Sequence, residues 1–212
     1  MVHRLGFTNN QARDFIQSGN VSIDGITVHE NCILDETQEV KIGGSIVRKA
    51  KKFSYIKFYK PRGFQSSLSP TVENNLSDFF KDLEGLSIAG RLDKESEGLL
   101  LLSNDGKWVE KICNPDSQKE KEYIVELNRT PGPEFFEQFS QGVLLGKHLT
   151  RPSICTPISG TKIRIILTEG KNRQIRRMTH KLGYNVTSLL RTRVDVYQLD
   201  GLEPASYEYI FT

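Results

Sequence analysis

Hydrophobic and polar positions predict a helix and two hairpins in the first 47 residues. Residues 8–18, TNNQARDFIQS, predict a short helix with Thr8 as its N-cap and Gly19 near its end. Short β-type runs follow, centred on the turn pairs Asp24-Gly25 and Gly43-Gly44. An Asp-Gly pair between alternating residues is a strong hairpin signal. We therefore expect a small α+β module over residues 1–47.

A second, larger pattern fills residues 53–212, after a basic linker at 48–52. Strand-type runs occur at 53–59, 121–128 and 161–170, and helix-type runs at 74–83, 105–112 and 133–141. Asp105 and Pro133 stand near two of the helix starts. Because strands and helices do not alternate regularly, the pattern predicts an α+β domain with a mixed or antiparallel sheet.

The segment 169–185, EGKNRQIRRMTHKLGYN, predicts a helix with two contrasting faces. Asn172 is a candidate cap, and the helix should end near Gly183. At 100° per residue one face carries Arg173, Arg176, Arg177 and His180, and the opposite face carries Ile175, Met178 and Leu182. Clustered arginines repel one another unless anions neutralise them. RNA phosphates, a protein carboxylate or bulk solvent would each serve.

Charge is distributed unevenly around a net value of +3. Residues 1–47 carry three basic and six acidic side chains, whereas residues 48–62 carry seven basic groups and no acid. Residues 160–193 carry nine Lys or Arg and one acid, Glu169. Basic clusters attract polyanions, although a solvated surface has the same composition. Aromatic residues interleave the first cluster, which suits base stacking and would equally suit a core.

Several classes of protein do not fit this composition. The three cysteines are widely spaced, which indicates reduced thiols in a cytoplasmic protein, and the four histidines lack ligand spacing for a metal. No 18-residue apolar run predicts a membrane span, and the first residues lack a signal-peptide core. A phosphate-binding G-x-x-x-x-G-K-(S/T) loop is also missing from the sequence.

Asp93 is the most prominent candidate for chemistry. It stands in GRLDKESEGLLLLSNDG, residues 90–106, between a glycine-led turn and the apolar run Leu99–Leu102. Taken alone, such an aspartate is more often a cap or an ion-pair partner than a catalyst.

Five motifs in order carry a resemblance to a known family. They are KPRG at 60–63, GRLDKESEGLLLLSNDG, KEY at 121–123, EGKNRQIRRM at 169–178 and RTRV at 191–194. Together they resemble the RsuA-type pseudouridine synthases (the RsuA/RluB/RluE/RluF group). Residues 4–47 resemble an S4-type RNA-binding module. The resemblance covers nearly the whole chain.

The resemblance implies an activity and a set of site residues. The protein would isomerise a uridine of ribosomal RNA, with the large subunit favoured and tRNA as a further candidate, without metal, redox cofactor or ATP. Asp93 would be the nucleophile, Arg176 its ion-pair partner and Tyr123 the group that stacks on the base. Ile175 would pack beneath that ring, and Arg91 would contact RNA where the nucleotide leaves the helix. The remaining expected RNA contacts are Arg173, Arg177, Lys60, Lys49, Lys51 and Lys52.

An alternative class stays open from the sequence. An S4-bearing protein that has lost activity could act in ribosome assembly. The presence of Asp93, Tyr123 and Arg176 together favours the enzyme. We expect a monomer with no membrane association.

Overall fold

A capping box starts helix α2 (Asn9–Gln17) in the computed structural model, which describes residues 6–210. The Thr8 amide donates to Gln11 Oε1 over 2.8 Å, and the Gln11 amide donates to Thr8 Oγ1 over 3.3 Å. Two otherwise unpaired helix donors are thereby satisfied. The predicted helix and its cap are confirmed.

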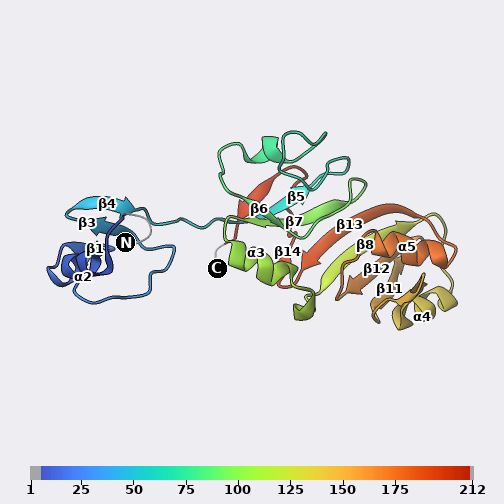
Figure 1. Ribbon diagram of the computed structural model, residues 1–212. Helices are drawn as coiled ribbons and strands as arrows, with labels where there is room; N and C mark the ends of the chain where they lie inside the picture. The colour runs from blue at the N-terminus through green and yellow to red at the C-terminus, as the bar shows by residue number, and fades with distance from the viewer. Residues whose placement is uncertain (1–5, 211–212) are drawn as a thin grey trace. The chain divides into compact units, whose positions relative to one another are not determined.

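The smaller unit, residues 1–53, contains a four-stranded sheet beside α2 (Figure 1). Its strands are β1 (Val21–Ile23), β2 (Ile26–Val28), β3 (Val40–Ile42) and β4 (Ser45–Arg48), in the order β2-β1-β3-β4. Asp24 and Gly25 take φ values of 49° and 82°, as a tight hairpin turn with two left-handed residues requires. Both predicted hairpins are confirmed.

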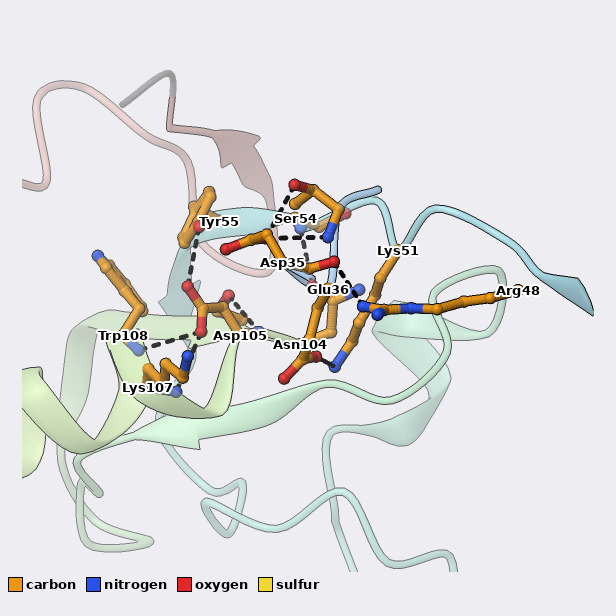
Figure 2. Close-up of polar contacts among 12 residues, drawn as sticks. Asp35, Glu36, Arg48, Lys51, Ser54, Tyr55, Asn104, Asp105, Lys107 and Trp108 are labelled. Carbon is orange, nitrogen blue, oxygen red and sulfur yellow. Dashed lines mark hydrogen bonds and ion pairs between the residues drawn. The ribbon is translucent and has the colours of Figure 1, made fainter. Parts of the chain in front are cut away.

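The predicted linker at 48–52 is bonded to the smaller unit. Arg48 is the last residue of β4, and its Nη2 donates to the Asp35 carbonyl over 2.5 Å. Lys51 contacts Glu36 twice, through its amide to the carbonyl over 2.9 Å and through Nζ to the carboxylate over 3.1 Å (Figure 2). The boundary between the two units therefore lies between residues 53 and 54, and the predicted linker belongs to the smaller unit.

The larger unit, residues 54–212, is built on one nine-stranded sheet. Its main path runs β11-β12-β8-β13-β7-β5-β15, with β14 paired to β13 and β6 to β7. The pair β13–β7 is parallel and the other pairs are antiparallel, so the sheet is mixed, as predicted. The strands are β5 (Tyr55–Lys60), β6 (Ser87–Ala89), β7 (Glu97–Ser103), β8 (Lys121–Leu127), β11 (Ile154–Ser159), β12 (Lys162–Leu167), β13 (Val186–Val194), β14 (Tyr197–Gln198) and β15 (Tyr207–Tyr209). A separate short pair joins β9 (Leu144–Leu145) to β10 (His148–Leu149).

Strand β7 carries four consecutive leucines, Leu99–Leu102, because both of its faces are covered. Leu100 and Leu102 belong to the main core, which also contains side chains of α4 (Pro133–Gln141) and α5 (Gln174–Lys181). Leu99 and Leu101 face a second cluster that includes Ile112 of α3 (Gly106–Cys113). All four leucines are fully buried. A strand buried on both faces loses the usual alternation, which explains the run in the sequence.

Helix α3 is joined to the sheet through its cap. Asp105 Oδ1 accepts from the Lys107 and Trp108 amides, and Tyr55 of β5 donates its hydroxyl to Asp105 Oδ2 over 2.9 Å (Figure 2). The cap at Asp105 and the helix start at Pro133 confirm the prediction. Among residues 6–210, no helix has the length and apolar character needed to span a bilayer.

The predicted helix at 74–83 is wrong in extent. Only a 3₁₀ turn, η1 (Ser77–Phe80), forms there, and a second such turn, η2 (Pro115–Ser117), follows α3. The Asn75 side chain explains the difference, since its Oδ1 accepts from the Ser77 amide over 2.7 Å and its Nδ2 donates to the Val72 carbonyl over 2.8 Å. Asparagine side chains that bond the local backbone compete with helix formation.

Candidate active site

A cleft of about 1150 Å³ opens in the larger unit beside the turn between β6 and β7. Segments far apart in the sequence line it: the turn 90–96, strand β8, the start of α5 and strand β13. The structure places six of the predicted site residues on this one cleft: Arg91, Asp93, Tyr123, Arg173, Ile175 and Arg176.

Asp93 lies in a turn whose backbone is held by hydrogen bonds from Ser96 and Ser66. The Ser96 amide donates to the Asp93 carbonyl over 3.0 Å, and Ser96 is 1% exposed. Ser66 bonds Leu92 in both directions: its Oγ donates to the carbonyl over 2.8 Å and lies 3.0 Å from the Leu92 amide. The Asp93 carboxylate itself has no hydrogen bond or ion pair with another residue in the range 6–210. It is therefore available to a ligand in the cleft.

Tyr123 and Ile175 are two of the apolar residues that line the cleft. Tyr123 lies on β8, in register with Ile165 of β12 on one side and Arg191 of β13 on the other, and is 8% exposed. Ile175 lies in the first turn of α5 and is 4% exposed. Both belong to the main buried cluster. A flat ring at the edge of a core gives a base one face to stack on.

Arg176 joins α5 to the turn that carries Asp93. Its Nη2 donates to the Glu95 carbonyl over 3.2 Å and to Ser96 Oγ over 3.3 Å, while Nη1 donates to the Val186 carbonyl over 3.3 Å. Burial lowers the pKa of Arg176, whereas the charges of Glu95 and Asp93 raise it. The predicted direct ion pair with Asp93 is not formed. Within residues 6–210, the carboxylate nearest to the Arg176 guanidinium is that of Glu95, with Nε to Oε2 at 3.9 Å.

The start of α5 differs from the prediction. Arg173, and not Asn172, is the N-cap, in a left-handed conformation with φ of 49°. Its side chain pairs with Glu95, and that hydrogen bond raises the pKa of Arg173 and lowers the pKa of Glu95. The Gln174 side chain instead accepts from the Lys171 amide over 3.0 Å. The Gln174 side chain therefore accepts a backbone hydrogen bond at the start of α5, where Asn172 was expected to act as the cap.

The other predicted RNA contacts fall into three places. Arg91 is exposed at the cleft, whereas Arg177 is exposed but outside its lining. Lys49, Lys51 and Lys52 are exposed in the smaller unit, with Lys51 paired to Glu36. Their contacts with RNA stay predictions. Among residues 6–210, no group of three or more His, Cys, Asp or Glu side chains could hold a metal ion.

Lys60 does not present its charge to a substrate. It is fully buried at the end of β5, and its Nζ donates to the Pro61 carbonyl over 3.0 Å and the Phe64 carbonyl over 2.8 Å. The predicted RNA contact is therefore wrong, because the amine faces inward and braces the following loop. Burial lowers the pKa of Lys60 to about 8, against the opposing attraction of Glu97.

Stability is expected to rise between pH 8 and pH 10.5 through Lys60. In this window the unfolded amine, with a pKa of 10.5, still binds a proton that the folded amine, with a pKa of about 8, has released. Unfolding then takes up a proton, so its free energy increases with pH, by about 3 kcal/mol in total. Urea unfolding, followed by Trp108 fluorescence, should show this rise in the wild type relative to Lys60→Met. Parallel pH curves would contradict the burial argument.

Two residues at the site were missed by sequence reasoning. Ser66 lies in a loop with no distinguishing pattern. Arg191 lies on β13, is 2% exposed and donates from Nε to the Leu99 carbonyl over 2.8 Å. The run SLLRTRV holds two cations, Arg191 and Arg193, and nothing in the sequence distinguishes the buried one from the other.

The fold and the cleft define a class of protein. A solved structure described as a crystal structure of pseudouridylate synthase matches 99% of this chain and 93% of its own, with a TM-score of 0.70 and 27% identity. The fold is therefore that of a pseudouridine synthase.

Sequence comparison then gives the family. The family described as RNA pseudouridylate synthase matches residues 54–181. Ribosomal small subunit pseudouridine synthase A of Vibrio vulnificus is 33% identical, covering 97% of this chain and 91% of that protein. The dual-specificity RNA pseudouridine synthase RluF of Escherichia coli K12 is 32% identical, covering 92% and 68%. The chain belongs to the RNA pseudouridine synthases of the RsuA/RluF type and is an isomerase that modifies RNA.

Proposed function

We propose that this enzyme converts a uridine of ribosomal RNA to pseudouridine, with Asp93 as the nucleophile. The observation that carries the proposal is the meeting of Asp93, Tyr123 and Arg176, from three different elements, on one cleft. Relatives named for ribosomal RNA and for dual specificity support the substrate class.

The reaction breaks the C1′–N1 bond of uridine and forms a C1′–C5 bond to the turned base. The proton on C5 is lost and N1 gains one, so no electrons enter or leave. Asp93 either attacks C1′ or assists formation of a glycal by removing a sugar proton. Its unpaired carboxylate and its fixed turn suit both routes. Arg176 of α5 supplies positive charge to the same turn.

The base must leave its stack before it can react. Extrusion costs a few kcal/mol, which contacts in the cleft must offset. In this proposal Tyr123, together with Ile175, provides a stacking face for the base and takes part in the later proton transfer from C5. Arg91 is proposed to contact the RNA that the nucleotide has left, and its exposure on the cleft lining supports this role.

The smaller unit is proposed to be an S4-like module that positions RNA. Its helix and two hairpins support this, and its lysines at 49, 51 and 52 extend from an otherwise acidic segment. We also propose that the enzyme acts in the cytoplasm as a monomer. The inactive assembly factor is disfavoured because all three catalytic candidates are present.

Replacing Lys49, Lys51 and Lys52 by alanine is expected to weaken RNA binding and flatten its salt dependence. Removing one lysine–phosphate interaction should reduce the slope of log K against log salt by about 0.7 to 0.9. Lys51 should contribute least, since it is paired with Glu36 in the free protein. Filter binding at several salt concentrations measures the slope.

A matched control keeps the number of charges removed constant. It replaces three exposed lysines outside the cleft lining: Lys81, Lys107 and Lys111. Equal slopes for the two triple variants would contradict phosphate contact at 49–52. Turnover at saturating RNA should stay near the wild-type value in both.

The experiment that tests the function is direct mapping. The purified enzyme is incubated with transcripts of small-subunit RNA, large-subunit RNA and tRNA, and pseudouridines are read by reverse transcription after carbodiimide treatment. A single new site in one ribosomal RNA is the expected result. Large-subunit RNA is the favoured substrate, because segments 120–128 and 189–199 resemble family members that act on that RNA. New sites in tRNA alone, or none in any transcript, would contradict the proposal.

A further inference from the structure

Arg191 lies between the two strands that frame the proposed catalytic residues. On β13 it is in register with Tyr123 of β8 on one side and with Gly98 of β7 on the other. It lines the cleft and is 2% exposed. A buried charge is costly unless its donors are satisfied, so this placement requires an explanation.

The Arg191 guanidinium donates hydrogen bonds to backbone carbonyls on both sides of the turn that carries Asp93. Nε donates to the Leu99 carbonyl over 2.8 Å, and Nη1 donates to the Arg91 carbonyl over 3.3 Å. These carbonyls lie on opposite sides of Asp93 in the sequence. Because the guanidinium is planar and its donors have a fixed geometry, the two bonds fix the backbone at Arg91 relative to the backbone at Leu99.

The remaining guanidinium nitrogen of Arg191, Nη2, argues against a purely stabilising role. Nη2 of Arg191 is buried and has no hydrogen-bond partner among residues 6–210. No carboxylate in that range forms an ion pair with Arg191. A buried cation with an unpaired donor destabilises the fold, and such exceptions require a reason. Bracing a catalytic turn provides one.

The backbone beside Arg191 is shaped for close approach. Gly98 has φ of +107°, and a Cβ added there would lie 2.3 Å from the Arg191 carbonyl oxygen and 2.8 Å from its nitrogen. Only glycine permits β7 and β13 to approach this closely. The close parallel contact sets Arg191 directly against the strand that continues from the Asp93 turn.

We infer that Arg191 is a positioning residue, which holds the Asp93 turn in its reactive geometry without touching the substrate. The inference rests on the proposed role of Asp93. Two carbonyl bonds, a fixed fork and a glycine-dependent strand contact together restrict where the carboxylate can lie. A displacement of about 1 Å in such a group costs about a hundredfold in rate.

The test compares Arg191→Gln and Arg191→Lys with Arg193→Gln, in the full-length enzyme. Arg193 is a control from the same strand, outside the cleft lining, where it pairs with Glu120. The single-turnover rate constant is measured with saturating enzyme over a transcript that contains the unmodified target uridine, so that it reports only folded enzyme. The dissociation constant for RNA and the unfolding midpoint are measured alongside.

Arg191→Gln should lower the rate constant about a hundredfold, with RNA affinity changed by less than about threefold. Arg191→Lys should recover only part of this rate, since one ammonium cannot serve both carbonyls in the same geometry. Arg193→Gln should stay within about threefold of wild type in rate. If Arg191→Gln does not fold, Arg191→Lys carries the test by its reduced rate.

Other results would overturn the inference. A wild-type rate constant in Arg191→Lys would show that only the positive charge of Arg191 matters. A weaker RNA affinity with an unchanged rate constant in Arg191→Gln would show that Arg191 contacts RNA. An unchanged rate in Arg191→Gln, with an inactive Asp93→Asn enzyme, would reject the positioning role and leave the proposed function standing. An active Asp93→Asn enzyme would instead reject the proposed role of Asp93 as the nucleophile, on which this inference rests, while a wild-type enzyme with no activity on any transcript would reject the proposed function.

Discussion

Asp93→Asn is expected to abolish tritium release from C5-labelled uridine in substrate RNA while the enzyme stays folded. The substitution keeps the shape of the side chain and removes its negative charge. Because the Asp93 carboxylate bonds no other residue in the described part of the chain, folding should lose little. The rate should fall more than a hundredfold, corresponding to about 2.7 kcal/mol of barrier.

The control for Asp93→Asn is Asp78→Asn, which removes a carboxylate whose side chain is 81% exposed in the 3₁₀ turn η1. Its tritium release should match that of the wild type. Urea unfolding by Trp108 fluorescence should give similar midpoints for all three proteins. If Asp93→Asn retains more than about one hundredth of the rate, the nucleophile must be reassigned.

Arg176→Ala is expected to reduce single-turnover rates about a hundredfold with near-normal RNA binding. The Arg176 side chain is mostly buried and bonds Glu95 and Ser96 of the turn that carries Asp93, so we expect its loss to affect the chemical step and not phosphate affinity. The size is typical of losing one preorganised electrostatic partner. Single-turnover kinetics and filter binding measure the two effects separately.

Two further variants sharpen the Arg176 result. Arg176→Lys keeps the charge and separates it from the bonds that the guanidinium makes. Lys181→Ala removes an exposed cation from the last turn of the same helix and should leave the rate unchanged. An Arg176→Ala enzyme that changed only in salt dependence would show that α5 is a phosphate-binding face.

Local patterns in the sequence were sufficient where one short segment decides the outcome. The Thr8 cap, the hairpins at Asp24-Gly25 and Gly43-Gly44, and the start of α3 at Asp105 depend on residues at most a few positions apart. The same reasoning failed at 74–83, where the Asn75 side chain bonds the backbone on both sides. A competing side-chain bond of that kind is invisible to a helical pattern.

The sequence by itself determined the class of fold, the family resemblance and the candidates Asp93, Tyr123 and Arg176, because motifs in order identify residue types. Only the tertiary structure decided which groups meet. In the structure Lys60 is buried, the carboxylate near Arg176 is that of Glu95 and not that of Asp93, and Arg191 bonds carbonyls on both sides of the turn that carries Asp93. The physical reason is that burial and bond geometry depend on strand order and register. Residues 92 positions apart, Leu99 and Arg191, become neighbours only when the parallel pairing of β7 with β13 forms.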